Sequence, residues 1–236
     1  ASCEEYYNGA AWKKINNVAL PPEKMFQLIN WTGTAAEQTI TYANSPDLVL
    51  IKNYDTSSNS DPWYWFDSTR GATKYIQSAS NAAEATDAQT LKSFTSTGFV
   101  LGTNDAVNGS GHNTYGFGFR VNGGVTSSNT DGSTTSTVQA NNQTGISIVK
   151  YTGTGANASV GHGLAAAPTL IIIKKLNSTS DWAAGTLDWT KYLEPNGTPD
   201  FRTANVWQDT APTDSVFTLT TGGDSNGNGN EYIAYC

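Results

Sequence analysis

Apolar residues along the chain fall into short runs and strict alternations, the two patterns typical of β-strands. Residues 48–52 and 170–174 are apolar up to a terminal lysine and each run begins shortly after a proline, which is typical of a strand buried on both faces. Residues 26–31 and 146–151 are predicted to be the strands that begin the two units. From 115 to 119 three aromatic residues alternate with two glycines, so we expect rings on one face of that strand and close approach of another layer on the other.

Only one stretch of the sequence resembles a helix. Residues 81–91 are rich in alanine, but their apolar positions lack the 3.6-residue spacing of an amphipathic helix. We expect a single turn or a loop there.

The sequence repeats itself after about 120 residues, which indicates a duplicated domain. The matching segments, in the same order in both halves, are 31–34 with 151–154, 46–52 with 168–174, 98–101 with 216–219, 108–111 with 226–229, and Tyr115, Phe117 and Phe119 with Tyr232, Ala234 and Cys236. The spacing between partners drifts by only a few residues, as loop insertions and deletions would produce.

These patterns predict an all-β protein made of two tandem β-sandwich units, concanavalin-like or similar, with little helix. We expect an N-terminal arm over residues 1–25, a first sandwich over 26–125 and a second over 126–236. The small polar residues of 125–143 are expected to join the two units.

Composition narrows the class of protein. The 236 residues carry a formal net charge of −7, which argues against a nucleic-acid partner because neutralising phosphates requires a basic surface. No run approaches the roughly 18 apolar residues of a membrane span. Aromatic residues make up 11% of the chain and supply large side chains for a core.

Residues that carry catalysis are scarce. Only 14% of the residues are charged, the glutamates are mostly isolated, and no G-x-S-x-G nucleophile motif is present. His112 and His162 both lie beside glycines and at different places in the two units, which favours turn residues over general bases or metal ligands. We expect a protein that is not an enzyme and uses no cofactor.

One segment resembles a calcium-binding loop. Asp224, Asn226 and Asn228 follow the first half of the pattern D-x-[DN]-x-[DN]-G. The twelfth position holds Tyr235, where the pattern requires a bidentate glutamate. The alternative is a long hairpin turn that uses asparagine and glycine for positive φ angles.

The densest aromatic run is 63–66. In a strand, Trp63 and Trp65 point to one face and Tyr64 and Phe66 to the other. Either the two tryptophans face solvent and stack on sugar rings, or a two-layer sandwich buries both faces.

The two cysteines, Cys3 and Cys236, lie at opposite ends of the sequence. They form either a disulfide that ties the termini together or two unpaired small apolar residues. Alignment of the repeats places Cys236 at the position of Phe119, an inward-facing strand position, which favours a core residue. The chain begins with Ala1 rather than Met, which indicates processing or trimming.

Several motifs together resemble a repeat domain found in tail-fibre-like and other structural proteins of marine bacteriophages. The segments that carry the resemblance are 70–75, 83–86, 91–94, 98–102, 108–111, 130–133, 151–153, 160–164 and 232–236. The resemblance extends over about residues 26–236 and implies tandem β-sandwich units without catalysis. Its motifs are scaffold turns and strands, so it implies no binding residues.

We therefore expect a non-enzymatic virion structural protein, extracellular on a phage particle: a fibre, an appendage or a capsid-decorating subunit. Its expected partners are other virion proteins and copies of itself in a homo-oligomer. The alternative is a receptor- or carbohydrate-binding module that recognises host surface glycans during attachment.

Overall fold

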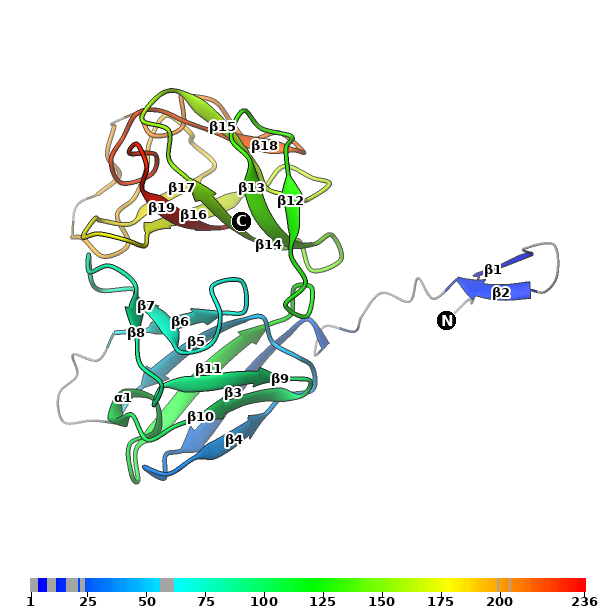
Figure 1. Cartoon of the computed structure of the whole chain (residues 1–236), viewed down its shortest axis with the longest axis vertical. Helices are drawn as coiled ribbons and strands as arrows, with labels where there is room; N and C mark the ends of the chain where they lie inside the picture. Colours follow the sequence, from blue (N-terminus) through cyan, green and yellow to red (C-terminus); the bar gives the residue numbers. More distant parts are fainter. Residues whose placement is uncertain are drawn as a thin grey trace.

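The structure, a computed structural model, describes residues 4–7, 12–15, 21, 24–55, 62–198, 200–203 and 205–236. Within these residues almost every regular element is a strand, and one helix of four residues is present. The prediction of an all-β fold with two sandwich units and little helix is confirmed (Figure 1).

The first sandwich consists of two antiparallel sheets. The larger sheet contains, in spatial order, β3 (Phe26–Thr32), β11 (Asn113–Phe119), β5 (Leu48–Asn53), β6 (Tyr64–Asp67), β7 (Lys74–Gln77) and β8 (Ala85–Thr86). The smaller sheet contains β4 (Gln38–Thr41), β10 (Gly98–Leu101) and β9 (Leu91–Thr95), and α1 (Asp105–Asn108) follows β10 along the chain.

The second sandwich has the same plan with a shorter second sheet. Its larger sheet contains, in spatial order, β12 (Ser127–Asn129), β13 (Ser136–Asn141), β14 (Ile146–Thr152), β19 (Glu231–Tyr235), β16 (Leu170–Lys175) and β17 (Ala183–Thr186). Its smaller sheet pairs β15 (Ala158–Gly161) with β18 (Val216–Leu219). Ahead of both sandwiches, β1 (Glu4–Tyr7) pairs with β2 (Trp12–Ile15) in a separate hairpin.

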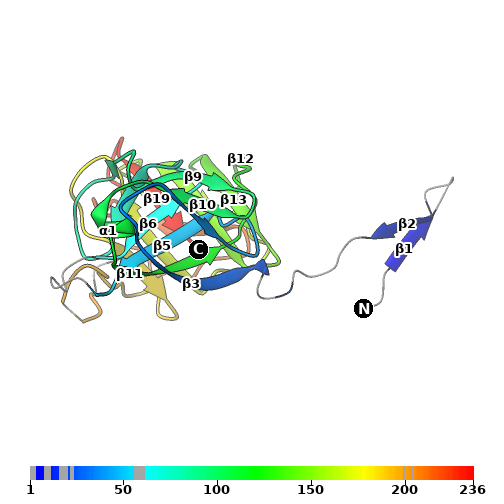
Figure 2. The same ribbon diagram turned by 90° about the horizontal axis from the view of Figure 1, so that it is seen from below.

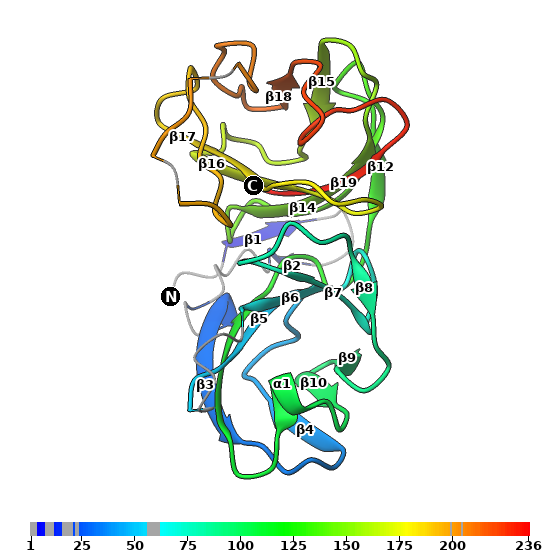
Figure 3. The ribbon, with the colours of Figure 1, turned by 90° about the vertical axis from the view of Figure 1, so that its left-hand side faces the viewer.

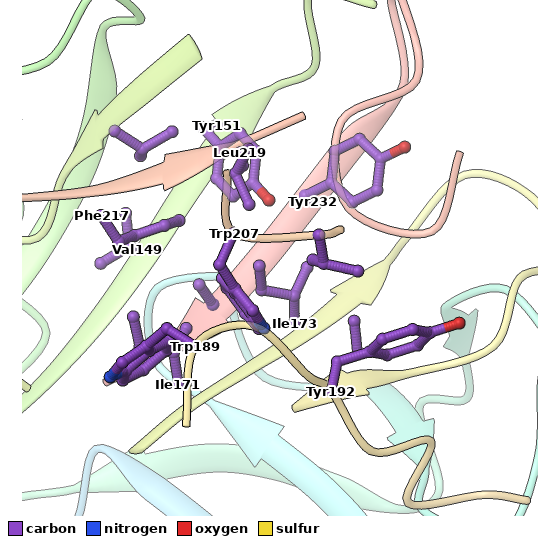
Figure 4. Close-up of a cluster of buried hydrophobic side chains, with 14 of the residues drawn as sticks. Val149, Tyr151, Ile171, Ile173, Trp189, Tyr192, Trp207, Phe217, Leu219 and Tyr232 are labelled. Atoms are coloured by element: carbon purple, nitrogen blue, oxygen red, sulfur yellow. The ribbon is translucent and has the colours of Figure 1, made fainter. Parts of the chain in front are cut away.

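Four layers of sheet enclose three hydrophobic cores. Each sandwich has a core between its large and small sheets, and Trp189 and Trp207 meet edge to face at 5.3 Å in the core of the second (Figure 4). The third core lies between the two large sheets, which face each other in the middle of the molecule (Figure 3). It joins Leu48 and Ile76 of the first unit to Trp182 and Ile233 of the second.

The two units share a loop that is built in the same way. In the first unit the Asn108 side chain accepts from the Thr34 amide at 3.0 Å and donates to the carbonyls of Ala36 and Gly102. In the second unit Asn226 accepts from Thr154 at 2.8 Å and donates to the carbonyls of Ala156 and Thr220 (2.7 and 2.8 Å). Both asparagines are buried. Asn108 therefore links the segment after β3 to the loop before β11, and Asn226 links the segment after β14 to the loop before β19.

The predicted match of Tyr115 with Tyr232 is one residue out of register. Trp31 and Tyr151 are equivalent by sequence, and the structure pairs Trp31 with Thr114 and Tyr151 with Tyr232. Because successive side chains point to opposite faces, a slip of one residue exchanges the two faces of the strand. Thr114 of the first unit therefore occupies the position that is equivalent to Tyr232 in the second unit.

The glycine alternation in β11 has the expected consequence. A side chain at Gly116 would place its Cβ 2.7 Å from the ring of Trp31 and from the Tyr42 hydroxyl. The inner face of β11 therefore needs glycine, while Tyr115 and Phe117 point to the outer face.

Two details of the predicted organisation are wrong. Residues 125–143, expected to be a connection, contain β12 and β13, because the short polar strands of a sheet edge have the composition of a loop. The short helix α1 has no counterpart among the predicted elements, and its N-cap is Asn104, whose side chain accepts from the Ala106 amide.

Candidate functional site

The aromatic run at the start of β6 alternates between two cores. Tyr64 and Phe66 pack into the first sandwich, whereas the ring of Trp65 lies 5.4 Å from Trp182 and 5.2 Å from Tyr235 of the second unit. Trp65, a predicted sugar-stacking residue, is therefore part of the contact between the two units.

Trp63 lies in a different environment. Its ring packs on Phe117 at 5.2 Å, and Phe117 stacks on Phe26 at 5.8 Å. Leu28 is the partner of Phe117 across the β3–β11 pair, so it shares their face. The two tryptophans that were predicted to stack on sugars therefore have different surroundings. Trp65 contacts the second unit, and Trp63 belongs to an open face of the first unit's large sheet.

That open face of β3 and β11 carries an unusual concentration of exposed apolar side chains. We call it the aromatic face and define it by Phe26, Leu28, Tyr54, Trp63, Tyr115 and Phe117. Phe26 is 40% exposed and Leu28 49%, and Tyr54 stacks on Tyr115 at 4.3 Å at the other end. Contiguous apolar patches of this kind on soluble proteins mark interaction surfaces.

A pocket of about 300 Å³ lies where the two units meet, and we call it the junction pocket. Its lining is Leu48, Leu50, Trp65 and Phe119 from the first unit and Gly145, Ile146, Pro168, Thr169, Leu170, Ile172, Tyr235 and Cys236 from the second. Phe119 also contacts Phe26 at 4.9 Å, so the junction pocket and the aromatic face are continuous. Pockets at domain interfaces with apolar linings are common binding sites.

Trp65 and Cys236 each add a polar side-chain atom to this mainly apolar lining. The indole nitrogen of Trp65 is buried and has no hydrogen-bond partner among the described residues. Burial raises the pKa of the Cys236 thiol to about 12, so the thiol stays neutral at physiological pH. The mainly apolar lining of the pocket therefore suits an apolar group.

A buried ionic network fixes the position of Trp65 and ties the units together. The Arg70 guanidinium pairs with Asp67, bonds Glu84 at 3.1 Å and donates to the carbonyl of Trp65 at 2.9 Å. Burial lowers the pKa of Arg70, but Asp67, Tyr235 and Glu84 together outweigh this effect and raise that pKa. From the second unit the Tyr235 hydroxyl donates to Asp67 at 2.7 Å.

A second polar cluster holds the connection between the units. The Asp47 carboxylate accepts from the amides of Val121, Gly123 and Gly124 at 2.7–2.9 Å. Gln139 of the second unit accepts from the Gly124 amide and donates to Ser68 of the first. The two units are thus joined by polar contacts as well as by the third core, which favours a fixed arrangement around the junction pocket.

The loop predicted as a weak metal site is used for structure at its centre. Both groups of the Asn226 amide are occupied by the three backbone bonds described above, and Asp224 accepts a hydrogen bond from Ser180. Asn228 is exposed. The loop is not a hairpin turn, because it connects β18 and β19, which belong to different sheets.

The two histidines lie in different units and make separate contacts. His162 is fully buried, its Nδ1 accepts from the Leu164 amide at 3.1 Å and its Nε2 faces the Thr213 carbonyl at 3.2 Å. His112 Nδ1 lies 3.1 Å from the Asn53 amide. The bonds to Asn53 and Thr213 each join residues more than 50 positions apart, so they are not the local turn bonds that the sequence predicts, and only the bond from Leu164 is local.

Among the described residues no cysteine is bonded to Cys236, whose side chain packs against the core of the second sandwich. With the corrected register it corresponds to Gly118, not to Phe119, which lines the junction pocket. Cys3 lies outside the described residues, so the Cys3–Cys236 bridge stays a prediction.

The fold and the site define an all-β protein of two β-sandwiches with an exposed apolar surface. Within the residues that the structure describes, no group of three or more histidine, cysteine or carboxylate side chains could hold a metal ion. No helix of the described chain is long and apolar enough to cross a membrane.

The chain belongs to a family that is described as Domain of unknown function (DUF7483), whose match extends over residues 21–236. The match includes both sandwiches and leaves the β1–β2 hairpin outside. No curated protein and no solved structure matches the chain.

Proposed function

We propose that the protein is a non-enzymatic structural protein exposed on a bacteriophage particle, as a fibre, appendage or capsid-decorating subunit. It acts outside the host cell, associates through its aromatic face, and has other virion proteins and copies of itself as partners. The single observation that supports association is the contiguous exposed apolar surface of β3 and β11. The sequence resemblance to virion repeat domains suggests the location.

The use of ionisable side chains also supports a structural role. The Asp47 carboxylate accepts from the backbone of the segment that connects the two units. The pair of Asp67 and Arg70 bonds Tyr235 of the second unit. Both ring nitrogens of His162 contact backbone groups. These groups rigidify the molecule and face one another or the backbone.

Purified particles of the phage that encodes this chain provide the test. We expect quantitative mass spectrometry to find the protein at a fixed number of copies per washed particle, and immunogold labelling to place it on the particle surface. Recovery of the protein only from the soluble fraction of the lysate would refute a virion location.

A carbohydrate-binding role in host attachment is the second candidate, and one observation favours it. The stacked pair Tyr54 and Tyr115 is exposed, and beside it Asp55 accepts from the backbone and side-chain amides of Asn113 at 2.9 and 2.7 Å. Sugars are bound by ring stacking together with hydrogen bonds from such oriented polar groups.

A glycan array distinguishes this second candidate. Binding by the wild type that is lost in Tyr115→Ala and kept in Leu187→Ala, a change of an exposed residue in the second unit, would support a sugar site. An array with no signal for the wild type would count against it and leave the structural role in place.

A further inference from the structure

We infer that the aromatic face and the junction pocket bind the β1–β2 hairpin of a second copy of this chain. This inference rests on the self-association part of the proposed function and names the two surfaces that make the contact. Its steps are the isolation of the hairpin, its composition and charge, and the position of its attachment point.

Within the part of the chain that the structure describes, the hairpin has no further strand partner. Among the described strands, β1 and β2 pair only with each other, and the hairpin lies apart from both sandwiches in two perpendicular views (Figures 1 and 2). A two-stranded hairpin alone is marginally stable in water. Docking on an apolar surface would supply the burial that it lacks.

The hairpin's sequence suits an apolar receptor. Its strands contain Tyr6, Tyr7, Trp12 and Ile15, and aromatic side chains of this kind dominate the energetics of protein contacts. The receptor offers exposed rings and a pocket whose volume of about 300 Å³ is at the small end for ligand sites, a size suited to inserted side chains.

Charge favours the hairpin over the sandwiches as the part of a second copy that makes the contact. Residues 1–25 contain three lysines and three glutamates, so the whole net charge of −7 belongs to residues 26–236. Two sandwich bodies would approach each other with like charge, which opposes association. The arm is neutral and meets no such barrier.

The attachment point of the arm makes the exchange reciprocal. The arm joins the first sandwich at Phe26, which is itself part of the aromatic face and contacts Phe119 of the junction pocket. Among the described strands, β3 is also an edge strand that pairs with β11 alone. The arm of each copy therefore begins beside the surface on which the arm of the other copy binds. Such a reciprocal contact is what a two-fold symmetric dimer requires.

The experiment uses three variants of the full chain and measures molar mass by light scattering after size exclusion. Leu28→Glu charges the aromatic face at a residue that is 49% exposed, and Trp12→Ser removes an aromatic residue from β2. Leu187→Glu is the matched control, because Leu187 is 86% exposed and lies outside the aromatic face. Near-ultraviolet circular dichroism checks that each variant keeps the wild-type fold.

We expect the wild type and Leu187→Glu to be oligomeric and the other two variants to be monomeric at the same concentration. An equimolar mixture of Leu28→Glu and Trp12→Ser is expected to regain a dimer, since one partner keeps its arm and the other its face. This recovery occurs only if an arm and a face of different copies form the contact.

Three results would overturn the inference. A monomeric wild type, a mixture that stays monomeric, or an oligomer that persists in both single variants each excludes contact between the hairpin and the aromatic face. The last of these leaves the proposed structural role intact through another interface. Absence of the protein from particles would instead refute the virion proposal while a recovered mixed dimer still supported the inference.

Discussion

Asn226→Ala is expected to destabilise the second sandwich strongly, although the residue lies in a loop. The Asn226 side chain is 1% exposed and makes hydrogen bonds of 2.7–2.8 Å to the backbone of Thr154, Ala156 and Thr220. Alanine removes all three partners at once. The first unit contains the same arrangement around Asn108, so the same change there provides an internal comparison.

The magnitude follows from the groups left without partners. A buried donor or acceptor that loses its partner costs about 1–3 kcal/mol. Thr154 and Ala156 are exposed residues, so water reaches part of their backbone and the lower end applies. Three groups at about 1 kcal/mol each predict a loss of about 3 kcal/mol in the free energy of unfolding.

Urea unfolding followed by tryptophan fluorescence measures this loss. A decrease of about 3 kcal/mol corresponds to a midpoint lowered by about 1 M. Asn228→Ala, in the same loop but exposed, is the control and should stay within about 0.5 kcal/mol of wild type. If Asn226→Ala shifts the midpoint no more than Asn228→Ala, the reasoning about a buried amide that holds the loop is wrong.

Three further predictions concern the junction and the buried titratable groups. Trp65→Ala should lower the free energy of unfolding by about 3 kcal/mol in the same urea assay, because it removes packing between the units; a change below about 1 kcal/mol would contradict that role. Burial lowers the pKa of His162 below 6.5, so the unfolded chain takes up the proton first and stability present above pH 6.5 is lost as the pH falls further. His162→Gln should therefore show a shallower loss of stability on acidification, and equal slopes would refute the assignment. Since the pKa of Cys236 is raised to about 12, iodoacetamide at pH about 8 should modify this thiol slowly in the native protein and rapidly in urea, as peptide mapping would show.

The periodicity of the sequence predicted the strands because each of them has one face that a single unit buries. The alternation of Tyr115 and Phe117 with glycines specified which face of β11 contacts the inner layer, and the close approach of Trp31 to Gly116 bears this out. The matching of the two halves succeeded for Asn108 and Asn226, whose bonds are the same in both units.

Neither the periodicity nor the matching of the two halves could specify which outer sheet faces are covered by the other unit. Whether Trp65 or Trp63 is open to solvent depends on the placement of the second unit, and the bond between Asp67 and Tyr235 joins residues 168 positions apart. The equivalence of Thr114 and Tyr232 was missed since a pattern of apolar residues tolerates a slip by one position, whereas the pairing of backbone groups does not.

The aromatic face could have been found only in part. Tyr115, Phe117 and Trp63 stand out in the sequence, but Phe26 and Leu28 look like ordinary alternating residues of an edge strand. The junction pocket has no local signal at all, because its lining comes from strands of both units.

The central claim is that this is a surface protein of a particle that associates through the aromatic face. A cryo-electron-microscopy map of the intact particle, at a resolution that distinguishes side chains, tests it most directly. The account predicts repeated copies of the two-sandwich fold on the outside of the particle, with Leu28 and Phe26 covered by a neighbouring chain. A particle without this fold, or copies whose aromatic face is open to solvent, would contradict it.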